Sequence, residues 1–431
     1  MSRASHASPH SRRTFLKQST AAAIGGTLAA TMGAARMAHA GGSDILRVGL
    51  VGCGGRGNGA AVNAMNAEEN VRLTALADLF PDKVEAAMNQ LSTMLGDKFQ
   101  VTKDRCFVGF DAYKQLINAD VDVVLLCTSP HYRPVQLRAA IEAGKHVFTE
   151  KPVAVDPVGV RSILESSELA TQKGLNIVSG LCWRYDFGVR ETIGRIKQGA
   201  IGDILAIHEN YLTGELKHAG RKPQWSEMEY QNRNWMYFTW LSGDHICEQF
   251  VHSLDKAMWV MDEQPPESAF GLGGRQKRTD PMWGHIYDHH AVCYQWSNGV
   301  KVFAYTRQMN GCHNDVDDYV IGTKGRAQVL INQQAGLING EPVFRGKKPS
   351  MYDQEHVELF EAIRKGTPIN DGRYTALSTM LAILGREACY TGQQITWDAM
   401  MKSNTRLGPE TYEWGDVPAG IVPVPGITKF A

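Results

Sequence analysis

This sequence lacks several features that would place a protein in a specialised class. Its 431 residues carry 45 basic and 45 acidic side chains, so the formal net charge is zero. We find no basic stripe that would point to nucleic acid as a partner. The eight cysteines are scattered without a C-x-x-C pair, so we predict no structural metal and assign no disulfide. With 43% apolar residues, the composition excludes disorder, collagen-like repeats and a disulfide-rich miniprotein, and the length predicts two or three domains.

The first forty residues lack acidic side chains and hold five basic ones, which leaves 40 basic and 45 acidic residues in the remainder. Ser11-Arg12-Arg13-Thr14-Phe15-Leu16-Lys17 is a twin-arginine export motif, and Ala38-His39-Ala40 supplies a cleavage site. The weakly apolar run between them, from Thr20 to Ala35, is shorter than the ~20 strongly apolar residues that a membrane-spanning helix needs. We therefore expect residues 1–40 to be a cleaved signal peptide. The mature protein is expected to be periplasmic, exported in the folded state and not inserted in a membrane.

Apolar runs alternate with amphipathic segments up to about residue 180. Strands separated by helices imply βαβ units and a doubly wound parallel sheet, which we assign to a domain over residues 41–180. The expected strands are 46–52, 71–78, 121–129, 146–150 and 175–181. The expected helices are one from residue 58, then 81–95, 134–144 and 162–173.

The rhythm changes after Gly202, where strand-like runs are joined by short turns. This pattern predicts an α+β domain over residues 181–403 with a large, mostly antiparallel, open-faced sheet. Its expected strands are 204–212, 268–273, 286–296, 301–308, 317–323 and 327–332, and its expected helices are 246–261, 352–365 and 374–391. The last helices can pack back on the first domain, and residues 404–431 are expected to form an extended arm. Because another subunit usually covers an open sheet face, we expect a homo-oligomer, a dimer or tetramer.

A glycine-rich motif follows the first expected strand. Gly52-Cys53-Gly54-Gly55-Arg56-Gly57 fits G-x-G-x-x-G, which lets a pyrophosphate approach a helix N-terminus. The second expected strand ends at Asp78, and an acidic residue there can accept both ribose hydroxyls and repel a 2′-phosphate. We therefore predict NAD as the cofactor, bound by Gly52, Gly54, Gly55, Arg56, Gly57 and Asp78.

Two further motifs stand at the carboxyl ends of expected parallel strands, where such sheets bind ligands. They are Thr128-Ser129-Pro130-His131 and Glu150-Lys151-Pro152. With the glycine motif they make the chain resemble the Gfo/Idh/MocA oxidoreductases over about residues 45–402. The resemblance implies that Lys151 contacts the reacting hydroxyl and the nicotinamide ribose, with Glu150 shaping its loop. We include Thr128, Ser129, Pro130, His131, Glu150 and Lys151 among the predicted cofactor residues.

The same resemblance implies a catalytic helix in the second domain. The family places an aspartate, a histidine four residues on, and another aspartate three residues later; this chain has Glu248, His252 and Asp255. On one continuous helix these three would share a face. Histidine can accept the hydroxyl proton, and the ammonium of Lys151 can stabilise the developing alkoxide charge. Glu248 departs from the family pattern, which puts the identity of the oxidised hydroxyl in doubt.

Substrate contacts are predicted from residue types. The aromatic segment 211–240, with Trp235, suits either a sugar-stacking surface or a loop buried at a subunit contact. Arg184 and Tyr185 open the second domain and are expected to line the site. Tyr287 and His289 in the expected strand 286–296, and His285 just before it, would lie on the same face of the sheet. We interpret Tyr287 and His289 as substrate contacts or polar sheet surface rather than as metal ligands.

These observations predict an NAD-dependent enzyme that acts on a sugar or glycoside. In one version NAD stays bound and is regenerated, either through oxidation, elimination, hydration and reduction of a glycoside or through oxidation of one sugar and reduction of another. The alternative is a simple sugar or inositol dehydrogenase. A non-catalytic sugar-binding protein is an alternative of another class. The sequence alone leaves hydrolase and oxidoreductase open.

Overall fold

The first sheet of the protein is entirely parallel. The computed structural model describes residues 44–329, 336–417 and 420–430. The strand order is β3-β2-β1-β4-β5-β6, and every neighbouring pair is parallel. Both faces are covered, so the central strands are buried runs of valine and leucine. The strands are β1 (Leu46–Val51), β2 (Val71–Asp78), β3 (Cys106–Val108), β4 (Val123–Leu126), β5 (His146–Thr149) and β6 (Ile177–Ser179).

Helices connect these strands as the βαβ pattern predicts. They are α2 (Gly55–Ala67), α3 (Pro81–Leu95), α4 (Ala112–Ile117), α5 (Arg133–Glu142) and α6 (Pro157–Lys173). The start of α6 follows local chemistry, because the Asp156 carboxylate caps the N–H of Gly159 and Pro157 occupies the first turn. The expected doubly wound parallel sheet is confirmed, although β3 and α4 were not predicted.

The second sheet has nine strands in the order β14-β13-β12-β11-β7-β10-β9-β8-β15. Its neighbours are antiparallel except for the parallel pair of β7 and β10. This confirms the expected mostly antiparallel sheet. The strands are β7 (Ile204–Thr213), β8 (Ser268–Gly274), β9 (His289–Gln295), β10 (Lys301–Gln308), β11 (Asp318–Gly322), β12 (Gly325–Val329), β13 (Leu337–Ile338), β14 (Glu341–Pro342) and β15 (Ile395–Thr396).

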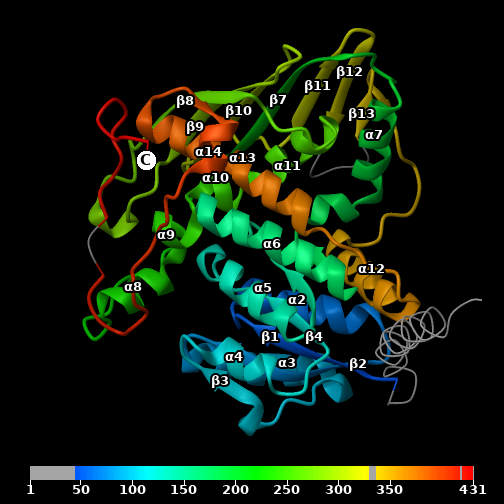
Figure 1. Cartoon of the computed structure of the whole chain (residues 1–431), viewed down its shortest axis with the longest axis vertical. Coiled ribbons are helices and arrows are strands. Elements are labelled where there is room, and N and C mark those ends of the chain that lie inside the picture. The colour runs from blue at the N-terminus through cyan, green and yellow to red at the C-terminus, as the bar shows by residue number, and fades with distance from the viewer. Residues whose placement is uncertain (1–43, 330–335, 418–419, 431) are drawn as a thin grey trace, which may run out of the picture. The chain divides into compact units, whose positions relative to one another are not determined.

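Helices cover one face of this second sheet. α13 (Gly372–Thr391) packs on β8 and β9 and also on α6, so it lies between the two sheets (Figure 1). α11 (Val251–Val260) packs on β7 and α13. Along β10 buried and exposed residues alternate, as one covered and one open face require. The remaining helices are α7 (Phe187–Lys197), α8 (Glu227–Arg233), α9 (Thr239–Ser242), α10 (His245–Glu248), α12 (Met351–Lys365) and α14 (Trp397–Lys402).

The expected continuous helix over 246–261 is wrong, because the chain breaks between α10 and α11. The carbonyl oxygen of Glu248 accepts a hydrogen bond from the Lys151 ammonium. In a continuous helix it would accept from the N–H of His252, which instead donates to the carbonyl of Gln249 at 3.3 Å. A side chain inserted into the helical ladder is a recognised cause of such breaks.

The expected strand 286–296 is also shorter than predicted, since β9 begins at His289. The preceding backbone bonds to other segments: the N–H of Tyr287 donates to the Asp244 carboxylate at 2.9 Å. The Asp288 carboxylate accepts from the N–H groups of Gln276 and Lys277, both at 2.8 Å. His285 and Tyr287 therefore lie outside the strand.

The C-terminal part of the chain returns to the first sheet. α12 packs on α2, where the Asn63 amide donates to the Asp353 carboxylate at 2.6 Å. The described residues of segment 404–431 contain no helix or strand, as expected for an arm. The predicted signal peptide lies outside the described residues. Within the part of the chain that is described, no helix is both long and apolar enough to cross a membrane.

Candidate active site

The glycine-rich loop between β1 and α2 has the geometry of a pyrophosphate cradle. Gly52 has φ +100°, and a Cβ there would lie 2.6 Å from the backbone of Cys127. A Cβ on Gly57 would lie 1.8 Å from the carbonyl oxygen of Gly52, so only glycine allows this approach of helix to strand. A Cβ on Gly54 or Gly55 would meet nothing within 4 Å. No side chain caps α2, so its N-terminus is available to an anion.

Asp78 lies at the end of β2 beside this loop. Its carboxylate accepts hydrogen bonds from the N–H of Cys53 at 2.6 Å and from that of Phe80 at 2.9 Å. Burial raises the pKa of Asp78, which the two backbone donors partly offset. The loop and the acidic strand end therefore fit the pyrophosphate and adenosine ribose of a dinucleotide.

The side chains of Arg56 and Glu150 face each other rather than open space. Arg56 pairs through Nε with Glu150, and its Nη2 donates to Glu355 on α12 at 2.8 Å. The Glu150 carboxylate also accepts from the N–H of Lys151 at 3.2 Å. The contact with the N–H of Lys151 agrees with the predicted role of Glu150 in shaping this loop. The cofactor contacts of Arg56 and Glu150 stay predictions. Arg56 and Glu150 thus tie the glycine loop to the loop that carries Lys151.

Lys151 and His252 come together between the two sheets, next to Glu248. The Lys151 ammonium bonds to the carbonyl of Glu248 and lies 3.3 Å from its carboxylate. His252 is the second residue of α11, just beyond the break, and its Nδ1 is buried without a hydrogen-bond partner. Burial, assisted by the charge of Lys151, holds the pKa of His252 well below its usual range. The site therefore presents a neutral imidazole close to an ammonium group.

Asp255 does not join this group. Both of its carboxylate oxygens accept from Arg184 at 2.8 Å, and one also accepts from Ser378 at 2.8 Å. Arg184 pairs as well with Glu263 at 2.8 Å and lies 3.9 Å from the ring centroid of Tyr374. We predicted Asp255 as catalytic and Arg184 as a substrate ligand. The bidentate pair and the contacts of Ser378 and Glu263 instead place both in an internal ion-pair network.

The other predicted substrate residues are dispersed. The buried hydroxyl of Tyr185 donates to Asp371 at 2.5 Å, and that of Tyr287 donates to the carbonyl of Pro423 at 2.8 Å. His289 Nδ1 lies 2.7 Å from the Asp288 carboxylate at the start of β9. The shared strand face on which we based the contacts of Tyr287 and His289 does not exist, because the strand starts only at His289.

The aromatic segment packs within the chain. A buried cluster joins residues of the segment to Ile286 and to Val417 of the arm, and Trp235 lies half-buried against it. These residues thus form a core within the chain rather than a sugar-stacking surface, which was one of the two alternatives for this segment. Its buried members from the segment are Met228, Tyr230, Tyr237, Phe238, Trp240 and Leu241.

The arm also covers a residue predicted to bind the cofactor. His131, in the turn after β4, lies with its Nε2 2.7 Å from the hydroxyl of Tyr412. Burial lowers the pKa of His131 to about 3. Thr128, in the same turn, donates to Gln136 at 2.7 Å, and Ser129 precedes the short helix that begins at Pro130. Sequence reasoning missed Tyr412, because no local pattern links it to the turn.

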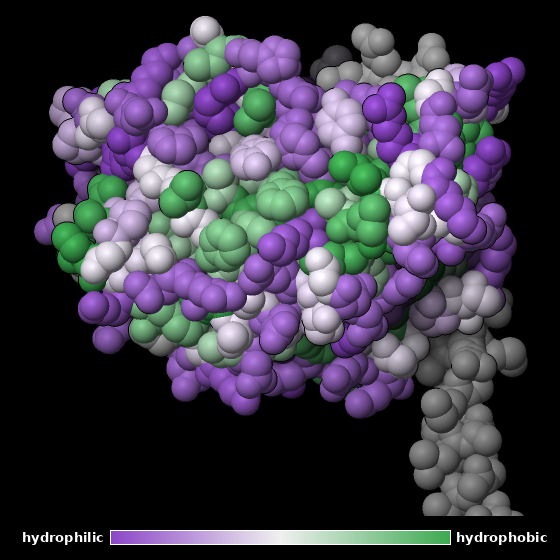
Figure 2. Space-filling view, turned by 90° about the horizontal axis from the view of Figure 1, so that it is seen from above, coloured by the Kyte–Doolittle hydropathy of each residue, from purple (hydrophilic) through white to green (hydrophobic). Residues whose placement is uncertain are grey.

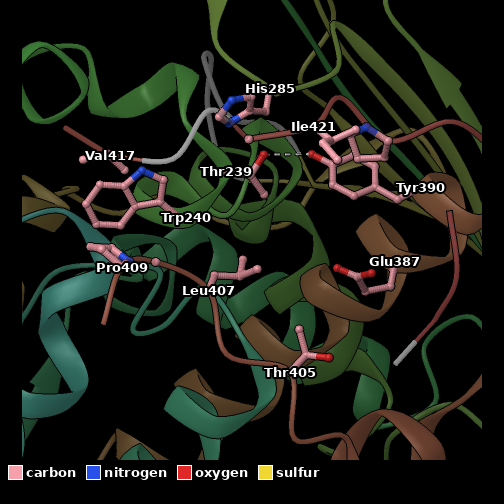
Figure 3. Close-up of a pocket in the computed structure, with 13 residues that line it drawn as sticks. Thr239, Trp240, His285, Glu387, Tyr390, Thr405, Leu407, Pro409, Val417 and Ile421 are labelled. Atoms are coloured by element: carbon pink, nitrogen blue, oxygen red, sulfur yellow. Dashed lines mark hydrogen bonds between the residues drawn. The ribbon is translucent and has the colours of Figure 1, made fainter. Parts of the chain in front are cut away.

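A cavity of about 340 Å³ lies beside the aromatic cluster rather than at Lys151 (Figure 3). Trp240, His285 and Tyr390 point into it from three different segments, and the arm contributes Leu407 and Ile421 to its lining. Neither Lys151 nor His252 lines this cavity.

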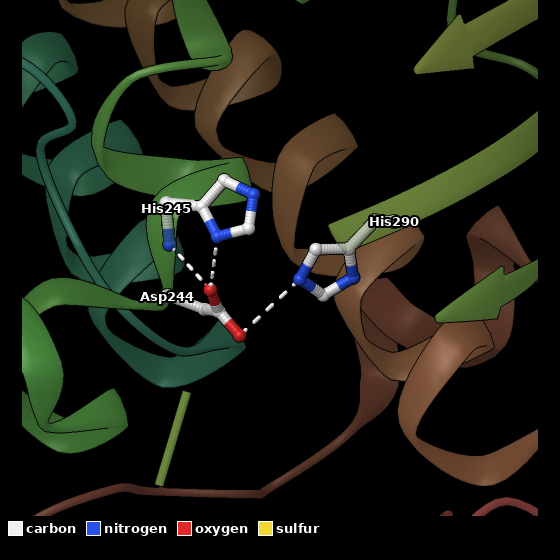
Figure 4. A group of neighbouring side chains, drawn as sticks. All are labelled: Asp244, His245 and His290. Carbon is white, nitrogen blue, oxygen red and sulfur yellow. Dashed lines mark hydrogen bonds and ion pairs between the residues drawn. The ribbon is translucent and has the colours of Figure 1, made fainter. Parts of the chain in front are cut away.

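Behind this cavity lies a buried group of Asp244, His245 and His290 that could surround a metal ion (Figure 4). The Asp244 carboxylate accepts from His245 Nδ1 at 2.9 Å and faces His290 Nε2 at 3.3 Å. The Tyr390 hydroxyl donates to it at 2.6 Å. Protein donors thus surround this carboxylate, which ties α10 to β9 and α13.

Comparison with known proteins places this geometry in a family. The model of the oxidoreductase family with an NAD-binding Rossmann fold matches residues 46–180, and the model of the GFO/IDH/MocA C-terminal domain matches residues 189–328. The chain is 23% identical over 361 residues to an inositol 2-dehydrogenase of Paracoccus denitrificans, covering 81% of this chain and 94% of that protein. It is 24% identical over 297 residues to the 2,7-anhydro-N-acetylneuraminate hydratase of Escherichia coli, covering 68% and 70%.

A solved structure supports the same fold. Scyllo-inositol dehydrogenase from Lactobacillus casei, crystallised with NAD(H) and scyllo-inositol, superposes with a TM-score of 0.62 at 19% identity, covering 82% of this chain and 99% of that one. Together with the matching family models, the glycine cradle and Asp78, this leads to one conclusion. The chain belongs to the Gfo/Idh/MocA family of NAD-dependent oxidoreductases, and residues 46–180 match its NAD-binding domain.

Proposed function

We propose that this protein oxidises a ring secondary hydroxyl of a sugar or glycoside with NAD that stays bound and is regenerated in every cycle. The observation that carries this proposal is the bond of the Lys151 ammonium to Glu248, close enough to the buried His252 for its charge to lower the pKa of that imidazole. The names of the inositol dehydrogenase and anhydro-sugar hydratase relatives support a polyhydroxylated substrate.

The residues divide the proton chemistry between them. When bound, NAD accepts the hydride from the carbon that carries the hydroxyl. The neutral imidazole of His252 accepts the hydroxyl proton, and the Lys151 ammonium stabilises the negative charge that develops on the oxygen. The carbonyl and carboxylate of Glu248 orient Lys151 toward that oxygen. On the return of hydride, His252 gives the proton back.

A redox-neutral cycle suits an exported enzyme. We propose that the twin-arginine segment exports the folded protein to the periplasm, a compartment that hardly supplies fresh NAD. In the glycoside version, oxidation acidifies the neighbouring C–H, the leaving group is eliminated, water adds and hydride returns. A hydratase likewise adds water without net oxidation, and one relative bears that name. In the other version one sugar is oxidised and a second is reduced.

A simple dehydrogenase is the second candidate, favoured by the inositol 2-dehydrogenase relatives. It requires NADH to leave after each turnover. A non-catalytic sugar-binding protein would need no imidazole beside an ammonium at the cofactor, so the presence of Lys151 and His252 argues against it.

We propose that a second copy of the chain covers the open face of the larger sheet. Viewed from above, hydrophobic side chains gather in the middle of that surface and hydrophilic ones surround them (Figure 2). Contiguous exposed apolar patches of this kind mark interaction sites. The exposed hydrophobic residues on its strands are Leu205, Phe270, Leu272, Phe303, Tyr305 and Ile321. Light scattering that gave a monomer mass for the purified protein would contradict this proposal.

The test of the cycle uses a panel of glycosides in D₂O. For the glycoside version we expect many turnovers on bound cofactor, no accumulation of NADH and solvent deuterium at the carbon beside the transient ketone. For two coupled sugars we expect equal amounts of oxidised and reduced product. Stoichiometric NADH release without deuterium incorporation would leave the simple dehydrogenase.

A further inference from the structure

The C-terminal arm lies along the edge of the parallel sheet where the cofactor is expected. Phe80 follows β2, Phe110 follows β3 and His131 follows β4. The ring of Trp414 lies 4.9 Å from that of Phe110 and 5.7 Å from that of Phe80, measured between centroids. Tyr412 adds the hydrogen bond to His131. A single short stretch of the arm therefore touches the ends of three strands.

This is the adenosine end of the site. Asp78, the expected ribose acceptor, is two residues before Phe80 and accepts from its N–H at 2.9 Å. Trp414 keeps 49% of its surface exposed although it packs on two aromatic rings. It therefore leaves indole surface available next to the place of the adenine ring.

The arm is anchored on both sides of this contact. Before it, the N–H of Leu407 donates to the Asp156 carboxylate at 2.9 Å. After it, the carbonyl of Gly415 accepts from the N–H of Met228 on α8 at 3.0 Å, and Val417 is buried in the aromatic cluster. The arm is thus held at both ends and crosses the strand ends between them.

α8 completes the enclosure from the second domain. Arg233 donates to both oxygens of Asp82 at the start of α3, at 2.9 and 3.1 Å. Its guanidinium lies 4.0 Å from the ring centroid of Phe80. Phe80 therefore contacts both Arg233 and Trp414, and each of the two belongs to the chain beyond the cofactor domain.

We propose that residues 407–417 form a clasp over the adenosine end of bound NAD, in which Trp414 contacts the adenine ring and Tyr412 holds the arm on His131. Release of the dinucleotide then requires the arm to lift from the three strand ends. This deepens the proposed function and rests on it, because a clasp that slows release is what a cofactor regenerated in place requires.

The test measures release of bound NADH from the full-length protein in the absence of any sugar. The protein is loaded with NADH, excess NAD is added, and the loss of NADH fluorescence gives the dissociation rate. We expect Trp414→Ala to speed release by about tenfold or more, and Tyr412→Phe to speed it by a smaller factor, since it removes one hydrogen bond. Trp414→Phe retains an aromatic face and should restore slow release. Ile421→Ala, at an exposed position farther along the arm, is the matched control and should leave the rate unchanged.

The outcomes separate the two proposals. Equal release rates for the wild type and Trp414→Ala would overturn the clasp, as would tighter NADH binding by Trp414→Ala, which would mean that the arm obstructs the site. If wild-type protein releases NADH faster than it turns over, the recycled cofactor is wrong. In that case the ratio between Trp414→Ala and wild type still decides whether the clasp exists. Circular dichroism of each variant verifies that it is folded.

Discussion

Two cation–carboxylate pairs lie where the two halves of the molecule meet, and they differ in how completely they are satisfied. Arg184 and Asp255 bond through two parallel 2.8 Å contacts, with Ser378 and Glu263 filling further positions. Lys151 makes one 3.3 Å contact with the Glu248 carboxylate, and His252 nearby has a buried nitrogen without a partner.

This difference separates charged groups that stabilise the fold from charged groups that remain available for catalysis. A buried ion pair with all of its oxygens and N–H groups occupied has nothing to offer a substrate, but losing one partner leaves the other charge buried. The Lys151 ammonium, which bonds only to the carbonyl and carboxylate of Glu248 among the described residues, can still bind a substrate oxygen, and the imidazole of His252, whose Nδ1 has no partner among them, can still exchange a proton. The predictions below test this contrast, from the largest expected effect to the smallest.

Removal of a partner from the satisfied pair should be the most costly change. We expect Arg184→Ala to lower the free energy of unfolding by about 3–5 kcal/mol, because the buried Asp255 carboxylate loses its counter-charge. Denaturant unfolding of both proteins measures the difference. The matched control is Arg195→Ala, which breaks the exposed pair with Glu191 and should cost about 0.5 kcal/mol or less. Equal effects for the two variants would remove the distinction between the pairs.

Removal of Lys151 or His252 should affect turnover instead of folding. We expect Lys151→Ala and His252→Ala each to lower turnover by ~10²-fold or more while bound NAD is retained, because each acts on the same hydroxyl. The double variant should lose less than the product of the two effects. Steady-state rates with a responsive sugar, together with cofactor content, test this. Lys402→Ala, in an exposed helical pair, is the control. Full activity in either variant would show that the residue replaced in it is not catalytic.

The next prediction concerns Asp78, whose carboxylate is only partly satisfied by the N–H groups of Cys53 and Phe80. We expect Asp78→Asn to weaken NAD binding roughly tenfold, through loss of the charged acceptor for the ribose hydroxyls, and to reduce discrimination against NADP. Calorimetry on cofactor-free protein measures both affinities. Unchanged NAD affinity would mean that Asp78 serves only the N–H groups of Cys53 and Phe80.

The smallest expected effect is a shift in the pKa of His252. Because burial and the Lys151 charge lower the pKa of His252, its neutral form should persist well below the ordinary histidine value of about 6.5. Activity should therefore fall only when the pH drops below that depressed pKa. Replacement of Lys151 by Met removes one positive neighbour and should raise the pKa of His252. Nuclear magnetic resonance of labelled histidine follows both, and titration of wild-type His252 near 6.5 would contradict the assigned environment.

Local sequence patterns predicted the elements that carry the cofactor site. The glycine loop and Asp78 belong to a short strand–turn–helix segment whose geometry depends on a few neighbouring residues. Predictions that needed a longer regular element were less accurate. The helix 246–261 is interrupted because Lys151, almost a hundred residues earlier, binds the carbonyl of Glu248. The strand 286–296 is shortened because Asp244 binds the N–H of Tyr287.

The sequence by itself determined the glycine cradle for NAD, because backbone sterics and strand–turn–helix connections act over a few residues. The roles predicted for Lys151 and His252 came instead from the resemblance to the family. Only the tertiary structure decided how the remaining charges and aromatic residues pair. Asp255 is satisfied by Arg184 and Ser378, from segments distant in the chain, and His131 meets Tyr412 across 281 residues. Side-chain partners at such separations depend on which segments the fold brings together, and no local pattern encodes that choice.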